Sequence, residues 1–447
     1  MSNRRIVHGV CIDLSSEGKG VVKDGKDVIF VDGLFVDEEA DIEVLYSRSG
    51  VHFGRIKKLY KSSKDRIEPK CKVCTVCGGC QFQQLAYSAQ LEYKTKKVKE
   101  ALKRIAHLDI DVKSCLGMND PYFYRNKIQV PFGVDKKGNI ICGFYKERSH
   151  EIIPIDECYI EDKRAHPILN TIKKLMKELR IAPYNEDLRQ GIIRHVLIRT
   201  SSTKPDLMVV LVVNHANFPG QRNFIKMLIE KHPEITTVVE NINTRSTNVI
   251  LGEKEYVLYG KGYIEDEILG LKFKISASSF YQVNPIQTET LYLEAIKEAK
   301  LEKEDIVLDA YSGVGTIGLL MAEYVNKVLS VEINKDAVKD AINNARQNAI
   351  SNVKFICDDA SRYINNTNEK IDVIVMDPPR KGSDETFLKA VLKAKPKKIV
   401  YVSCSPETLA RDLITLTKKY DIKSVQPVDM FPMSSHIENV VLLEIKN

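Results

Sequence analysis

Short apolar runs alternate with longer amphipathic stretches from about Leu271 to the end of the chain. This order is expected when each strand of a parallel sheet is followed by a helix. The most apolar runs span residues 328–332, 371–376, 399–404 and 440–445. The pattern predicts an α/β domain with a Rossmann-like sheet over residues 266–447.

The first part of the chain has a different pattern, in which short strand-like segments follow one another. Residues 28–31 form an apolar run, and residues 40–44 alternate between apolar and polar side chains. Because short strands in an open sheet leave exposed edges, a closed OB-like β-barrel is the economical fold for residues 1–61. Basic residues between Arg55 and Lys64 fit a solvated face and an RNA contact equally well.

Residues 62–265 predict a central domain of mixed α/β structure. Its strongest strand candidates are residues 191–200 and 206–214. Residues 84–107 contain many lysines, no glycine and no proline, which is typical of a helix. We expect this helix to pack on the C-terminal domain.

A glycine-rich turn follows the first strand of the C-terminal sheet, starting at Asp309. Gly313, Gly315 and Gly318 have the G-x-G-x-x-G spacing that lets a backbone approach a dinucleotide. Glu332 ends the next strand, where its carboxylate can accept hydrogen bonds from both ribose hydroxyls. From this segment alone, an NAD site is one interpretation.

A second motif, Asp-Pro-Pro-Arg beginning at Asp377, favours another cofactor. It follows a strand and resembles the substrate-facing loop of S-adenosylmethionine-dependent methyltransferases, with prolines that stiffen it. Asp309 at the glycine turn agrees with this, and Asp359 is either an adenine contact or a solvated acid. Arg380 stands where amino-group methyltransferases have an aromatic residue, which disfavours an exocyclic amine as the target.

Cys404 lies at the carboxyl end of the run 399–404, where ligands of open α/β sheets bind. Most free cysteines are small buried hydrophobes, but a thiolate here is placed to attack a ligand. Methylation of C5 of a pyrimidine requires a thiolate that adds to C6 and a base that removes the C5 proton. Glu438, before the last strand, is the best candidate base. His436 is an alternative, although orienting the loop is the role we favour for it.

The composition narrows the class of protein. The chain has 447 residues, which is too many for one core, and its net charge of +7 is a mild bias toward polyanions such as RNA. No apolar run reaches the length of a membrane span, and no apolar signal region follows residues 1–5, so we expect a cytoplasmic protein.

Four of the ten cysteines are each separated by two residues, namely Cys71, Cys74, Cys77 and Cys80. In a long cytosolic chain, this cluster indicates an iron–sulfur centre or, as a second choice, a zinc site. On spacing alone, all four are candidate ligands.

Together these segments resemble the TrmA family of S-adenosylmethionine-dependent RNA (uracil-5-)-methyltransferases, most closely its 23S rRNA branch with an N-terminal TRAM domain. The resemblance spans nearly the whole chain. It rests on the start of the barrel, the cysteine cluster and residues 280–284, 309–313, 377–382, 402–404 and 436–438. Two departures are Ser312, where cysteine is usual, and Ser435, where threonine is commoner; both leave the chemistry intact.

The resemblance implies roles for the site residues. S-adenosylmethionine would be held by Gln282, Tyr311, Glu332 and Asp377, with weaker contacts from Asp309, Gly313 and Asp359. Cys404 would be the nucleophile and Glu438 the proton acceptor, and Asp377 would also hydrogen-bond to the uracil ring. The family pattern also implies a [4Fe–4S] cluster, with Cys74 as a bystander and with the ligands Cys71, Cys77, Cys80 and Cys158.

The resemblance also bears on the substrate. RNA cytosine-5 methyltransferases carry a second cysteine after the proline of the loop, where this chain has Arg380, so cytosine is disfavoured. We expect a monomer that transfers a methyl group from S-adenosylmethionine to C5 of a uridine in 23S rRNA, through a covalent adduct between Cys404 and C6. The alternatives are a uridine in tRNA and, in another class, a non-catalytic RNA-binding iron–sulfur protein.

Overall fold

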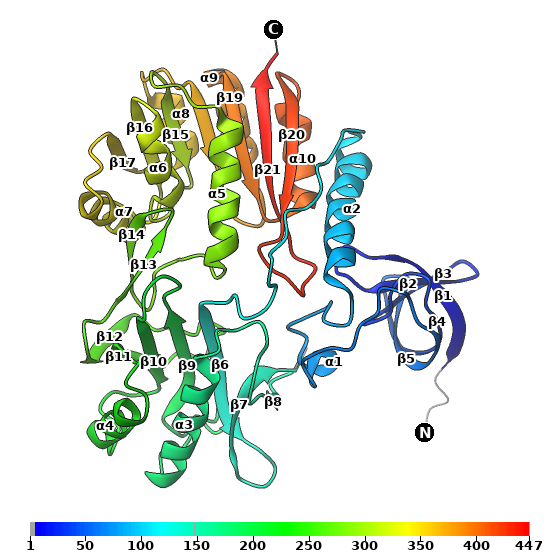
Figure 1. The fold of residues 1–447 in the computed structure, drawn as a ribbon, viewed down its shortest axis with the longest axis vertical. Helices are drawn as coiled ribbons and strands as arrows, with labels where there is room; N and C mark the ends of the chain where they lie inside the picture. Colours follow the sequence, from blue (N-terminus) through cyan, green and yellow to red (C-terminus); the bar gives the residue numbers. More distant parts are fainter. Residues whose placement is uncertain (1–4, 147–148, 447) are drawn as a thin grey trace.

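The computed structural model describes residues 5–146 and 149–446. Figure 1 shows a barrel near the N-terminus, a central sheet and a C-terminal sheet, with one long helix between the barrel and the C-terminal sheet. The first four residues, on which the expectation of no signal region partly rests, lie outside the described residues.

Five strands form the closed barrel, in the order β1-β2-β3-β5-β4, which confirms the predicted barrel. Its interior contains fully buried apolar side chains such as Val22, Ile29 and Ile42. Gly54 is required for this packing, since a Cβ there would lie 2.5 Å from Ile42 Cγ2. The strands are β1 (Ile6–Leu14), β2 (Gly20–Asp24), β3 (Asp27–Val31), β4 (Glu39–Arg48) and β5 (Val51–Lys61).

Two helices follow the barrel, the short α1 (Cys74–Cys77) and the long α2 (Tyr87–Ala106). Lysines cover much of α2, but Val98 and Leu102 are fully buried in the same apolar cluster as Tyr420 of the C-terminal sheet. Helix α2 therefore belongs to the packing of that sheet, although it precedes the central sheet in sequence.

The central sheet has seven strands in the order β12-β11-β10-β9-β6-β7-β8. Strands β9 and β10 are buried along their whole length, because two helices pack on one face and the C-terminal core meets the other. The elements are β6 (Lys127–Val134), β7 (Ile140–Tyr145), β8 (Ile152–Pro154), α3 (Ala165–Glu178), β9 (Ile193–Thr200), β10 (Leu207–Val213), α4 (Gln221–Lys231), β11 (Thr237–Ile242) and β12 (Lys254–Tyr259).

A hairpin of β13 (Ile264–Ile268) and β14 (Leu271–Ile275) leads into the C-terminal sheet, whose order is β17-β16-β15-β18-β19-β21-β20. The first five strands are parallel, and β21 runs antiparallel to both of its neighbours, β19 and β20. Its strands are β15 (Ile306–Ala310), β16 (Lys327–Glu332), β17 (Val353–Cys357), β18 (Val373–Met376), β19 (Lys398–Ser403), β20 (Tyr420–Val428) and β21 (Glu438–Ile445).

Helices cover both faces of this sheet, which confirms the α/β class. They are α5 (Pro285–Ala299), α6 (Thr316–Met321), the 3₁₀ turn η1 (Ala322–Tyr324), α7 (Lys335–Gln347), α8 (Ala360–Asn366), α9 (Glu385–Ala394) and α10 (Pro406–Leu416). The strand order reverses between β15 and β18, so a crevice is expected at the carboxyl ends of these strands. No helix among the described residues is long and apolar enough to cross a bilayer.

Candidate active site

The turn between β15 and α6 is shaped by a buried carboxyl group. The backbone N–H of Gly318 donates to Asp309 Oδ2 at 3.0 Å, and a Cβ at Gly318 would lie only 2.6 Å from that oxygen. Burial raises the pKa of Asp309 to about 7, and the negative charges of Asp377 and Glu332 add to the shift. Asp309 therefore fixes the start of α6 from inside the sheet.

Glu332 holds the outer side of the same turn. Its carboxylate accepts hydrogen bonds from the N–H of Gly313 at 3.0 Å and the N–H of Asn334 at 2.7 Å. Gly313 has φ +56°, in the left-handed region that glycine adopts most easily. Glu332 at the end of β16 is thus hydrogen-bonded to the turn that follows the neighbouring strand, β15.

Two other predicted cofactor residues have identifiable partners. Tyr311, at φ +64°, packs its ring 5.2 Å from the ring of Phe387 on α9. Asp359 caps α8, because one carboxylate oxygen accepts from the N–H of Arg362 at 3.0 Å.

One buried tyrosine interacts with several site residues and was not predicted from the sequence. Tyr292 on α5 hydrogen-bonds to Gln282, and burial together with the charge of Asp377 raises its pKa. The sequence does mark this position, because Leu291, Tyr292 and Ala295 share one side of α5, which is buried. A tyrosine hydroxyl on a buried helix face needs a hydrogen-bond partner. Burial also raises the pKa of Asp377 to about 7.

Cys404 directly follows β19 and is half-buried. Burial, followed by the charges of Glu438 and Asp377, raises the pKa of its thiol to about 11, while Arg380 acts in the opposite direction. In the free protein the thiol is therefore protonated at neutral pH.

Glu438 begins β21, which pairs antiparallel with β19, so the start of β21 meets the end of β19. Asn439 strengthens this junction by donating from Nδ2 to Ser403 O at 3.1 Å. Glu438 is buried, and burial and Asp377 raise its pKa. The structure thus brings together the predicted nucleophile and the predicted base.

His436 lies two residues before Glu438, exposed on the rim of the groove, with its ring centroid 6.1 Å from that of Phe431. Partial desolvation and the nearby cations Arg380 and Lys97 lower its pKa. An uncharged imidazole on the rim of the groove fits a role in orienting the loop better than a role as a charged group in catalysis.

A groove of about 860 Å³ connects this edge with the barrel and the cysteine segment. Cys404, Arg380 and His436 line one end. Lys19 and Arg55 of the barrel and Gln81 beside the cysteines line the rest.

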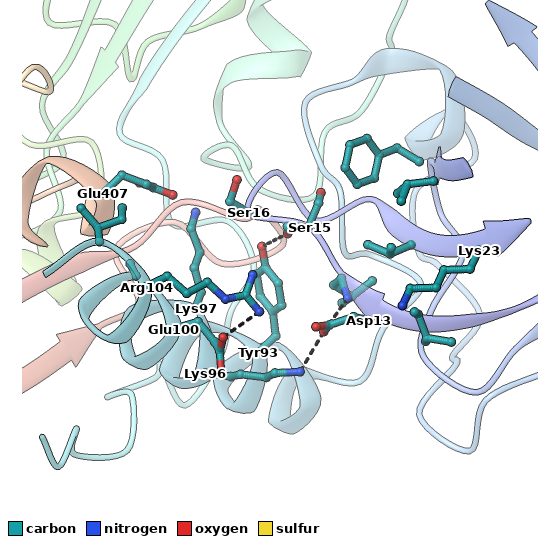
Figure 2. Close-up of a pocket in the computed structure, with 17 residues that line it drawn as sticks. Asp13, Ser15, Ser16, Lys23, Tyr93, Lys96, Lys97, Glu100, Arg104 and Glu407 are labelled. Atoms are coloured by element: carbon teal, nitrogen blue, oxygen red, sulfur yellow. Dashed lines mark hydrogen bonds and ion pairs between the residues drawn. The ribbon is translucent and has the colours of Figure 1, made fainter. Parts of the chain in front are cut away.

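Figure 2 shows a second cleft of about 580 Å³, between α2 and the barrel. Tyr93 Oη donates to Ser15 O at 2.7 Å, and Lys96 pairs with Asp13 at 2.8 Å, so α2 is fixed against β1. Lys97 lines both this cleft and the groove.

The cysteine cluster faces a third cavity, of about 410 Å³. Five thiols line it, those of Cys71, Cys74, Cys77, Cys80 and Cys158. Burial raises the pKa of the Cys80 thiol to about 12, and neighbouring thiols add to the shift. Thiols are the ligands of iron–sulfur and many zinc centres, but no three cysteine sulfurs among the described residues lie within 4.8 Å of one another, so the cavity is not a clear metal site.

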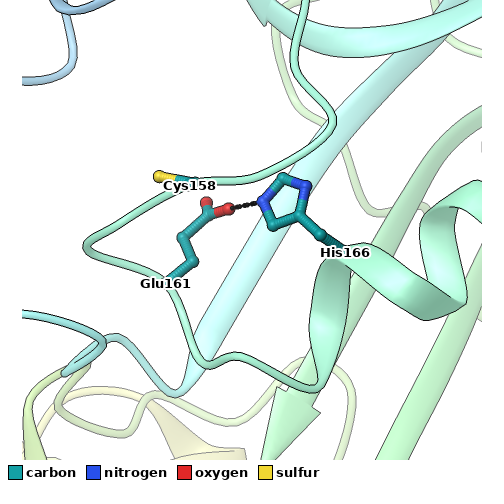
Figure 3. Close-up of side chains that lie close together, drawn as sticks. All are labelled: Cys158, Glu161 and His166. Atoms are coloured by element: carbon teal, nitrogen blue, oxygen red, sulfur yellow. Dashed lines mark hydrogen bonds and ion pairs between the residues drawn. The ribbon is translucent and has the colours of Figure 1, made fainter. Parts of the chain in front are cut away.

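Cys158 has further neighbours (Figure 3). Its Sγ, a carboxylate oxygen of Glu161 and a ring nitrogen of His166 lie within 4.8 Å of one another. His166 Nε2 and Glu161 Oε2 are 2.7 Å apart, in a hydrogen bond buried from solvent. This hydrogen bond attaches the segment that bears Cys158 and Glu161 to helix α3, which bears His166.

A sequence model described as tRNA (uracil-5-)-methyltransferase matches residues 86–446. The chain belongs to this family of RNA (uracil-5-)-methyltransferases. Members use S-adenosylmethionine, so the NAD interpretation of the glycine turn is wrong and the methyltransferase interpretation is confirmed.

Two RNA methyltransferases and one solved structure are similar to this chain over nearly its full length. An uncharacterized RNA methyltransferase of Halalkalibacterium halodurans is 44% identical over 97% of this chain and 96% of that protein. One of Staphylococcus aureus is 40% identical over 98% of each. A structure of the Pyrococcus abyssi tRNA (uracil-54, C5)-methyltransferase with S-adenosyl-L-homocysteine has a TM-score of 0.78 and 28% identity, covering 98% of this chain and 100% of that one.

Proposed function

We propose that this enzyme methylates C5 of a uridine in 23S rRNA, with Cys404 as nucleophile and Glu438 as proton acceptor. One observation carries the assignment of the two residues. The pairing of β21 with β19 sets Glu438 and Cys404 at the same sheet edge, and Cys404 opens into the groove.

The groups at this edge support a four-step reaction. Cys404 first loses its thiol proton to solvent, and the thiolate then adds to C6, which turns C5 into an enolate-like carbon. C5 takes the methyl group from the sulfonium of S-adenosylmethionine, and S-adenosylhomocysteine leaves. Glu438 accepts the C5 proton. The C6–S bond then breaks, and Cys404 leaves as a thiolate.

The cofactor site we propose consists of Gln282, Tyr311, Glu332 and Asp377. Glu332 is already oriented by two backbone N–H groups, which suits a carboxylate that accepts from ribose hydroxyls. Asp309 and Gly313 would act by shaping the turn, and Asp359 has one carboxylate oxygen left beside its capping bond.

We also propose a [4Fe–4S] cluster bound by Cys71, Cys77, Cys80 and Cys158. The thiols that line one cavity support it, and Cys74 would be the thiol without an iron. Such a cluster would cross-link the cysteine segment to the central sheet, a structural role that requires no electron transfer.

The choice of 23S rRNA rests on the TRAM-like barrel, whose basic residues line the groove. A uridine in tRNA is the second candidate, because the Pyrococcus abyssi protein is named for uracil-54 of tRNA. In either RNA the target must be unpaired or flipped out of its helix to reach Cys404. We expect a monomer to suffice.

The experiment that tests the function is labelled methyl transfer from S-adenosylmethionine to RNA of a strain that lacks the gene, followed by mapping of 5-methyluridine. We expect label in 23S rRNA with the wild-type protein and none with Cys404→Ser. Label in tRNA alone would replace the substrate, and the absence of 5-methyluridine from all RNA would favour the non-catalytic RNA-binding protein.

A further inference from the structure

The loop that leads to Glu438 is held by one stripe of helix α2. Residues 429–437 connect β20 with β21 and end directly before Glu438. The stripe consists of Tyr87, Gln90, Lys94 and Lys97, which are three or four residues apart and so share one face of the helix.

Tyr87 and Lys94 fix the start of the loop. Lys94 and Asp429 form a fully buried ion pair, and Tyr87 Oη donates to Asp429 Oδ2 at 2.9 Å. Lys94 Nζ also donates to Phe431 O at 3.1 Å. Asn284 and Gln287 of the α5 segment bond the same part of the loop, so it is held from two sides.

The contacts nearest to Glu438 come from α2 and from the cysteine segment. The Met433 N–H donates to Gln90 Oε1 at 3.0 Å, and Lys97 Nζ donates to Ser435 O at 2.9 Å. Phe82, two residues after Cys80, donates its backbone N–H to Met433 O at 3.0 Å.

Helix α2 is itself held on its other sides. Tyr93 and Lys96 tie it to the barrel, and Val98 and Leu102 pack into the C-terminal core. A helix fixed against two domains is a rigid support for a loop, and polar bonds at alternate loop residues define a single loop position.

We propose that Gln90 and Lys97 are positioning residues for proton removal from C5, acting by holding residues 433–435 so that Glu438 meets the substrate. This inference rests on the proposed function of Glu438. Cys404 is attached to β19 and α10 rather than to this loop, so once RNA is bound, attack on C6 and methyl transfer should not depend on how the stripe holds residues 433–435.

The test separates the two halves of the reaction with two RNA substrates. In RNA that contains 5-fluorouridine, fluorine occupies the position of the C5 proton and cannot leave as a cation. The adduct with Cys404 forms and takes the methyl group, and the C6–S bond then persists. The rate of adduct formation on this RNA reports attack and methyl transfer, whereas release of methylated product from ordinary RNA also requires proton removal.

We expect Gln90→Met to form the 5-fluorouridine adduct at nearly the wild-type rate. Lys97→Met also removes a cation from the groove, so its rates are compared with the wild type at saturating RNA. Both should release product from ordinary RNA more slowly, by on the order of tenfold to a hundredfold, because small misplacements of a reacting group cost that much. The covalent protein–RNA adduct should then accumulate on a denaturing gel. Lys97→Arg keeps a donor for Ser435 O and should restore product release.

Thr95→Val is the matched control. It removes a bond of α2 to the N–H of Cys115, 2.9 Å long, without touching the loop, so both rates should stay at the wild-type value. Equal slowing of both rates in Gln90→Met and Lys97→Met, or no slowing in either, would overturn the inference alone. A wild-type protein that forms no 5-fluorouridine adduct would overturn the proposed function and the inference with it.

Discussion

At the scale of single residues, the site combines an inactive thiol with a buried acid. The pKa of Cys404 is raised to about 11, and the pKa of Glu438 is raised as well, in both cases first by burial. A carboxyl group with a raised pKa is a stronger proton acceptor once it is ionised, which suits removal of a proton from carbon. The same two residues were predicted from sequence. For Tyr292 the sequence marks only a buried position on α5, because its partners Gln282 and Asp377 come from other segments.

Glu438→Gln tests the base directly. The amide keeps the size of the side chain but cannot accept the C5 proton, so turnover should fall on the order of 10²- to 10⁴-fold. Methylated protein–RNA adduct should accumulate, measured with labelled methyl groups on a denaturing gel. The double variant Cys404→Ser, Glu438→Gln should form no adduct. Free methylated product at the wild-type rate would exclude Glu438 as the base.

At the scale of elements, the cysteine segment and the stretch that bears Cys158 are brought to one cavity by folding. The spacing of two residues between cysteines marked Cys74 as a possible ligand, and only the family pattern separated it from the other three. Geometry leaves the choice open because Cys74 lines the same cavity.

Replacing cysteines one at a time decides the ligand set. With the proposed cluster bound, the wild-type protein should contain iron and sulfide and absorb visible light, and Cys158→Ser should lose all three, because a four-iron cluster takes one thiolate from each of four cysteines. Cys74→Ser should keep all three. The opposite result, with Cys74 essential and Cys158 dispensable, would assign the cluster to the four clustered cysteines.

At the scale of the whole molecule, the groove runs from Cys404 to the barrel. Its basic residues come from regions that are far apart in the sequence. From the sequence alone, Arg55 fits a solvated face and an RNA contact equally well. Arg55 is 65% exposed although it bonds to Glu43, so it keeps donors for a phosphate.

RNA affinity should therefore depend on salt. Each phosphate contact adds about 0.7 to 0.9 to the slope of log affinity against log salt. Arg55→Gln should reduce the slope by that amount, measured by RNA binding of the full-length protein over a salt series. Lys226→Gln, on α4 of the central region, is the control and should leave the slope unchanged. An unchanged slope in Arg55→Gln would exclude the barrel face from the RNA interface.

The sequence by itself determined the α/β class, the barrel, the family and the candidates Cys404 and Glu438. These follow from local patterns, since strand periodicity, glycine turns and motifs are properties of neighbouring residues. Only the tertiary structure decided what lies together. The groove, the Tyr292 contacts and the support of the Glu438 loop by α2 join residues far apart in the sequence; the hydrogen-bonded Gln90 and Met433 are 343 positions apart. Such pairs depend on which faces pack, and no local pattern encodes that.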